Sequence, residues 1–89
     1  MLEGKELAVA VAKKLDWILE DGIDLLGLDG AIREMAAEIL FSEGMAERID
    51  DYLMLHPELY MEYEIDTTKI WWRTITPEKI LNVYLELED

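Results

Sequence analysis

The ionisable side chains of this chain of 89 residues limit the chemistry that it could perform. Aspartate and glutamate together number 21, whereas there is one histidine, His56, and no cysteine. A zinc site made of thiolates or paired histidines is therefore excluded, and so is a cysteine nucleophile. His56 is followed by Pro57 at the end of a predicted helix, and we expect it to cap that helix or to face solvent.

The acid-rich stretch from Glu20 to Gly30 has the composition of a calcium-binding loop but not its spacing. With Gly22 or Gly30 as the central glycine, the first and third ligand positions fall on apolar or glycine residues that cannot coordinate by side chain. No carboxylate pair stands out as a general acid and base, and a chain of 89 residues leaves little room for the desolvated cleft that such a pair needs. We therefore predict that the protein is not an enzyme and uses no metal and no cofactor.

The sharpest binding signal is the tryptophan pair Trp71 and Trp72. If residues 60–66 and 69–75 are strands, these neighbours point to opposite faces, so that Trp72 enters the core and Trp71 stays exposed. Aromatic and arginine side chains in a charged surround are typical of protein-binding hot spots. Alternatively, Trp71 only packs on neighbouring side chains of the sheet. The predicted partner-binding residues are Trp71, Arg73, Tyr84, Glu62, Glu64, Asp66 and Glu86.

Amphipathic helices are predicted in the first 58 residues. Residues 3–21 place their apolar side chains on one face and are followed by Gly22, which is typical of a C-terminal cap. Asp29 is a suitable N-cap for a second helix over 31–42. A third helix over 45–55 ends before the His-Pro pair. The outward acidic side chains of the last two helices form a second predicted contact surface, which consists of Glu34, Glu38, Glu47, Asp50 and Asp51.

From residue 59 onward the composition favours strands. Apolar and acidic residues alternate from Met61 to Asp66, which is the period of a half-buried strand. Thr76 and Pro77 could begin a helix or form a turn, but the alternation over 81–88 favours a third strand. We therefore predict one α+β domain (1–89), in which three helices (1–58) pack on a three-stranded antiparallel meander (59–89). The predicted inner sheet face consists of Met61, Tyr63, Ile65, Ile70, Trp72, Leu81, Val83, Leu85 and Leu87.

The formal net charge of −13 determines which partners are compatible with this surface. Such a charge repels nucleic acid and anionic lipid and attracts basic protein surfaces, although solubility alone explains it equally well. No apolar run approaches the roughly 20 residues of a membrane span, and the first residues do not resemble a signal peptide. We therefore expect a cytoplasmic protein that binds neither nucleic acid nor a membrane.

The leading functional hypothesis is a small inhibitor that covers a basic, nucleic-acid-binding surface of a larger protein. Phage-type inhibitors of host nucleases, including anti-CRISPR proteins, have this size and charge, which is an analogy and not a motif match. Imitation of DNA would need more than one acidic strand, because alternate strand residues lie about 6.7 Å apart whereas a duplex carries a charge every 1.7 Å or so. The alternative is a homodimeric structural or regulatory module, such as an antitoxin-like subunit, joined through apolar surface.

Overall fold

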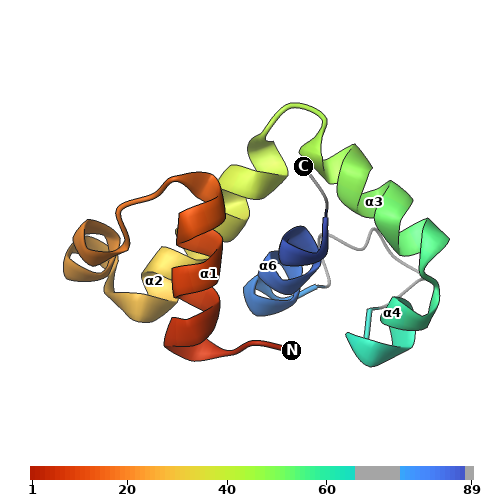
Figure 1. Cartoon of the computed structure of the whole chain (residues 1–89), viewed down its shortest axis with the longest axis horizontal. Helices are drawn as coiled ribbons and strands as arrows, with labels where there is room; N and C mark the ends of the chain where they lie inside the picture. Colours follow the sequence, from red (N-terminus) through yellow and green to blue (C-terminus); the bar gives the residue numbers. More distant parts are fainter. Residues whose placement is uncertain (66–74, 88–89) are drawn as a thin grey trace.

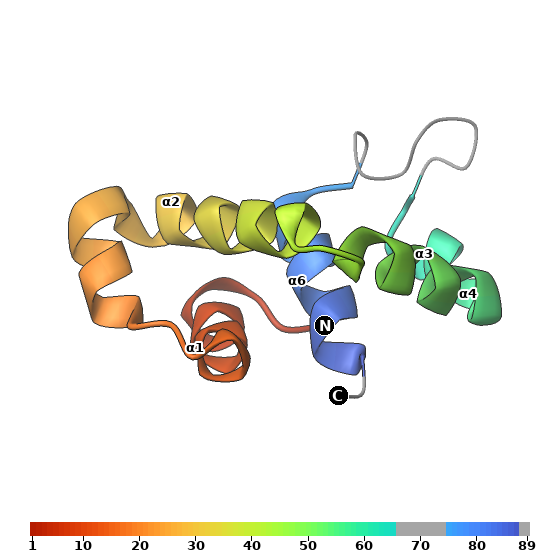
Figure 2. The same ribbon diagram turned by 90° about the horizontal axis from the view of Figure 1, so that it is seen from above.

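The structure, a computed structural model, describes residues 1–65 and 75–87, and every regular element within these ranges is a helix. The helix α6 lies in the centre of the molecule, with α1 to one side of it and α3 and α4 to the other (Figure 1). The long helix α2 contacts α1, α6 and α3, and therefore links the two ends of a body measuring 37 × 23 × 20 Å (Figure 2). The elements are α1 (Gly4–Leu15), α2 (Leu19–Phe41), α3 (Met45–Leu55), α4 (Glu58–Glu62) and α6 (Pro77–Glu86).

The predicted α+β class with a three-stranded antiparallel meander is wrong, because the described residues contain no strand and form an all-helical domain. The predicted third strand is helix α6. Thr76 precedes α6 with an extended backbone, and Pro77 lies in the first turn of the helix. Of the two alternatives for Thr76 and Pro77, a helix start and a turn, the structure therefore shows the helix start. The run from Ile80 to Tyr84 is buried without a break. In a helix that is surrounded by protein, alternating polarity does not show which side chains face the core.

The predicted first strand is the end of helix α4 followed by a turn where the structure describes it. Helix α4 ends at Glu62, and its buried side chains Leu59 and Tyr63 are four residues apart, on one helical face. Met61, which was expected in the core, is 86% exposed. After Glu64, whose φ is 54°, the chain turns away and Ile65 is buried. Tyr63 and Ile65 thus lie in the core as predicted, but without a sheet, and the predicted core positions Ile70 and Trp72 lie outside the described residues.

The predicted helix over 3–21 is two helices in the structure. Asp16 adopts the left-handed conformation (φ 58°) and ends α1, and its backbone N–H donates to the carbonyls of the last turn. Gly22 is not a cap, because it is buried within α2 beside Trp17, where a Cβ would lie 2.5 Å from Trp17 Cζ3. The glycine that does interrupt a helix is Gly27, which kinks α2 with φ 75° and ψ 170°, a region essentially restricted to glycine.

The core faces of the second and third predicted helices are confirmed, but the second helix does not begin after an Asp29 cap, because Asp29 lies inside α2 beyond the kink at Gly27. The second half of α2 buries Ile32, Met35 and Ile39, at the predicted helical spacing. Helix α3 spans the predicted 45–55 and buries Ile49 and Leu53. Both helices face the core on one side only. In such a helix the apolar stripe in the sequence predicts which side is buried.

Two polar side chains attach α6 to the start of the chain. Asn82 is buried; its Oδ1 accepts from the Leu2 N–H (2.9 Å), and its Nδ2 donates to the carbonyls of Leu2 (3.0 Å) and Glu78 (2.8 Å). Lys14 Nζ donates to the Tyr84 carbonyl (2.8 Å) and to that of Leu87 (2.6 Å), and so satisfies the C-terminal end of α6. These contacts join α6 to the N-terminal segment and to α1.

Candidate functional site

The predicted partner-binding residues were expected to lie together on one face of a β-sheet. The described residues contain no sheet. Asp66, Trp71 and Arg73 lie outside the ranges that the structure describes. Tyr84, which was expected on the outer face, lies on α6 and is 6% exposed, with Lys14 Nζ 4.5 Å above its ring centroid. Tyr84 therefore packs inside the helical domain and is not available as a surface contact.

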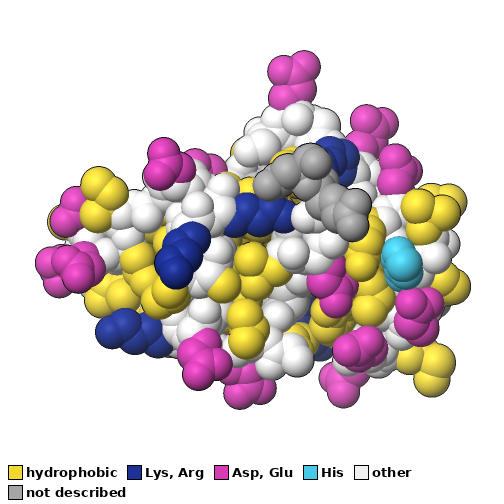
Figure 3. All heavy atoms as spheres, viewed as in Figure 1, with side chains coloured by type: hydrophobic (Ala, Val, Ile, Leu, Met, Phe, Trp, Pro, Cys, Tyr) yellow, Lys and Arg dark blue, Asp and Glu magenta, His cyan; other side chains and the backbone are white. Residues whose placement is uncertain are grey.

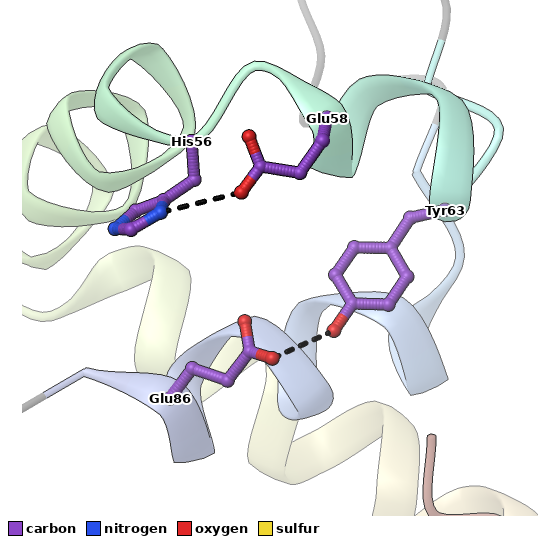
Figure 4. Close-up of polar contacts among 4 residues, drawn as sticks. All are labelled: His56, Glu58, Tyr63 and Glu86. Atoms are coloured by element: carbon purple, nitrogen blue, oxygen red, sulfur yellow. Dashed lines mark hydrogen bonds and ion pairs between the residues drawn. The ribbon is translucent and has the colours of Figure 1, made fainter.

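The acidic members of the predicted site that the structure describes, Glu62, Glu64 and Glu86, are exposed, but two of them have internal partners. Tyr63 Oη donates to Glu86 Oε1 at 3.4 Å, which links the end of α4 to α6 (Figure 4). Burial, followed by the negative charges of Glu86 and Glu62, raises the pKa of Tyr63 to about 12. Glu64 lies 3.9 Å from Lys79 Nζ. Glu64 and Glu86 thus contribute to local contacts between α4 and α6 as well as to the surface charge.

The residues of the second predicted surface lie on α2 and α3. Glu34 and Glu38 lie one turn apart on the exposed side of α2. Glu47 and Asp51 are exposed on α3, and Asp50 is partly buried. Because α2 and α3 contact each other, these carboxylates belong to two adjoining helices and give this part of the molecule a negative surface.

An exposed apolar patch at the end of α3 and α4 was missed from the sequence. Met54 is 67% exposed, Leu55 78% and Met61 86%. On the α3 wheel, Met54 and Leu55 fall away from the buried Ile49 and Leu53, and this offset was the available signal. Figure 3 shows hydrophobic side chains at this end of the molecule, on both sides of the chain's single histidine. We define the α3–α4 tip as Met54, Leu55 and Met61 with the exposed acidic residues of the same turns, Asp51, Glu58 and Glu62.

His56 lies at this tip and ends α3, at the helix end that the sequence predicted. Its ring centroid is 4.4 Å from that of Tyr52, and its Nδ1 is 3.4 Å from Glu58 Oε1 (Figure 4). The side chain is 44% exposed. Stacking and one carboxylate orient this imidazole at the surface.

The described residues form neither a candidate metal site nor a candidate membrane span. Within residues 1–65 and 75–87, no three histidine, aspartate or glutamate side chains are grouped so that they could hold a metal ion. Over the same ranges, none of the helices combines the length and the apolar character required to cross a membrane.

Comparisons with known proteins identify no relative of this chain. No family model matches it, and no match is found among curated proteins or among solved structures.

Proposed function

We propose that this protein is a small acidic binding protein that covers a basic surface of a larger protein partner through the α3–α4 tip. The observation that supports this proposal is the exposure of Met54, Leu55 and Met61 beside carboxylates of the same helical turns. Large apolar side chains that are grouped at a surface and rimmed by charge are typical of protein interaction sites. The rim charge here is negative, so the complementary partner surface is an apolar spot surrounded by lysine and arginine.

The two components of the tip have different roles in the proposed mechanism. The net charge of −13, with exposed carboxylates on α2 and α3, accelerates encounter with a basic surface. The apolar side chains slow release, because burying one Met or Leu side chain contributes roughly 1.5–3 kcal/mol. A partner that uses its basic surface to bind nucleic acid would be inhibited by simple occlusion. Trp71 and Arg73 remain predicted contacts of this interaction.

The apolar component is tested with variants of the tip. A partner is first captured from extract at low salt, identified, purified and titrated by calorimetry. The double variant Leu55→Ser/Met61→Ser should raise the Kd about 10-fold to 100-fold, because two anchors are lost from the centre of the contact. Phe41→Ser is the matched control, since Phe41 is 88% exposed but belongs to the end of α2. An equal loss of affinity in both variants would remove the tip from the proposal.

The acidic component is tested by the rate of association and its salt dependence. Glu47→Gln/Asp51→Asn should lower the association rate at low salt, and the difference from the unaltered protein should shrink as salt screens the charges. Glu3→Gln/Asp21→Asn is the matched control, because it removes the same charge from exposed positions on other segments. Binding that does not respond to salt would contradict the proposal, as would a complex that leaves the partner's nucleic-acid binding unchanged.

A further inference from the structure

The outward side of α1 is a ridge with a hollow on each side. Lys5, Val9 and Lys13 are spaced four residues apart, so they lie one above the other on the helix. One hollow, of about 660 Å³, lies between α1 and the first half of α2, and a second, of about 540 Å³, lies on the other side of α1. The same three residues line both hollows. We define them as the α1 ridge.

The larger hollow has an apolar base and walls of opposite charge. Its α1 wall carries the lysines of the α1 ridge, its α2 wall carries Glu20 and Asp24, and Asp16 lies between them at the end of α1. All five charged side chains are exposed, and Val9 is 38% exposed. The remaining apolar lining consists of Ala12, Trp17, Leu19 and Ile23.

The distribution of basic residues sets this surface apart from the rest of the described molecule. Helix α1 carries Lys5, Lys13 and Lys14, whereas no other helix in the described ranges carries more than one lysine or arginine. Dark-blue side chains accordingly gather over α1 in Figure 3. In a protein of net charge −13, two copies repel each other over most of their surfaces, and α1, with three lysines and one glutamate, is the only helix of the described ranges with a net positive charge.

We infer that two copies of this chain associate here in a two-fold dimer, with the α1 ridge of each copy in the hollow between α1 and α2 of the other. A purely basic partner would be repelled by the lysines of the ridge, and a purely acidic partner by Glu20 and Asp24. A second copy carries both features, and two-fold symmetry places each ridge against the acidic wall of the other copy. Val9 and the apolar base of the hollow are then buried at the centre of the contact.

This inference goes beyond the proposed partner binding and does not depend on it. The α1 ridge and the α3–α4 tip lie at opposite ends of the molecule (Figure 1). Variants of one surface therefore leave the other surface intact, and the failure of one proposal can be told apart from the failure of the other.

The first test is sedimentation velocity of the purified chain over a concentration series up to about 1 mM, in about 0.15 M salt so that long-range repulsion is screened. The expected result is a reversible equilibrium between monomer and dimer. Lys13→Glu should raise the dimer Kd at least about ten-fold, because it places like charges together at two symmetric positions. The matched control, Arg33→Glu, makes the same charge change on an exposed part of α2 and should leave the Kd unchanged.

The second test exchanges the charges between copies. Lys5→Glu/Lys13→Glu makes both walls acidic, and Glu20→Lys/Asp24→Lys makes both walls basic, so that each variant alone should be monomeric. Mixed in equal amounts, the two variants should form a heterodimer, because each ridge then meets a wall of opposite charge. All four positions are exposed, so both variants should remain folded, and circular dichroism is the check.

Each result of these tests decides for or against the inference. A dimer that is weakened by both charge variants and regained in the mixture supports it. A chain that stays monomeric throughout the concentration series overturns it, and the groove then belongs to a different occupant. A dimer whose Kd is unchanged by the charge variants also overturns the inference. A mixture of the two variants that fails to associate overturns it as well.

Discussion

Replacing Asn82 tests whether the central helix is held by the hydrogen bonds of one buried amide. In the structure this side chain accepts from the Leu2 N–H and donates to the carbonyls of Leu2 and Glu78. Asn82→Ala removes all three contacts. Asn82→Asp keeps the shape and the acceptor, but it replaces the donor by a negatively charged oxygen that faces two carbonyl oxygens. The two variants therefore separate the loss of hydrogen bonds from the presence of a repulsive charge.

The expected magnitudes follow from the geometry. Each hydrogen bond contributes a net 0.5–1.5 kcal/mol or so, and the backbone groups of Leu2 can bond to water in the variant because Leu2 is 37% exposed. We therefore expect Asn82→Ala to lower the free energy of unfolding by about 2 kcal/mol, which is a fall in Tm of about 8–16 °C for a domain of this size. Asn82→Asp should lower it by about 3–5 kcal/mol at neutral pH, because an unpaired charge is then buried.

The assay is urea unfolding followed by circular dichroism at several pH values. Burial and the neighbouring carbonyls should raise the pKa of the introduced carboxyl above that of the unfolded chain. The neutral form, which can donate to a carbonyl, is then favoured in the folded state, so the deficit of Asn82→Asp relative to the unaltered protein should shrink as the pH falls towards about 4. The reasoning would be refuted if Asn82→Asp were as stable as Asn82→Ala at neutral pH, or if its deficit did not change with pH.

Two further predictions concern the kink in α2 and the junction between α4 and α6. Gly27→Ala should lower the free energy of unfolding by about 1–3 kcal/mol, because φ 75° with ψ 170° is strained for a residue with a Cβ; Gly44→Asn, at a left-handed position that asparagine tolerates, is the control in urea unfolding. The pKa of Tyr63 is raised from 10.0 to about 12, so its neutral form is favoured in the fold and the associated stability is lost as the pH rises from 10 to 12. Tyr63→Phe should flatten the fall in stability over that interval, and an unchanged slope would contradict the assignment.

The helices that could be predicted from the sequence are those with one buried side. Residues 31–42 and 45–55 place Met35, Ile39 and Ile49 on stripes that face the core, so the pattern and the structure agree. Helix α6 lies between other helices, and its run from Ile80 to Tyr84 is buried irrespective of polarity. Tyr84, which was predicted as a partner contact, and Asn82 are both buried, because Lys14 and Leu2 provide their polar partners. Those partners lie more than 65 residues away in the chain, and no local pattern reveals them.

The glycines show a second limit of local sequence rules. Gly22 has the position of a C-terminal cap relative to the apolar stripe over 3–21, but in the structure it provides room for Trp17. The left-handed residue that ends α1 is Asp16, which has no glycine signal. Of the candidate sites, the exposed carboxylates of α2 and α3 and the outward Met54 follow from helical spacing. The hollow between α1 and α2 does not, because it arises from how the helix break at Asp16 folds α2 back beside α1.

The arrangement of charge gives the two ends of the molecule different chemistry. The α1 ridge combines lysine with apolar surface, whereas the α3–α4 tip combines apolar surface with carboxylates. Association of two copies through α1 would leave both tips exposed, because α6 and the second half of α2 separate α1 from α3 and α4 (Figure 2). Such a dimer would present two acidic tips to one partner assembly. If the partner carries two basic surfaces within reach, the second contact becomes intramolecular, and the overall affinity exceeds that of either tip alone. Weak contacts at each α3–α4 tip would then be sufficient to keep the partner's basic surfaces covered.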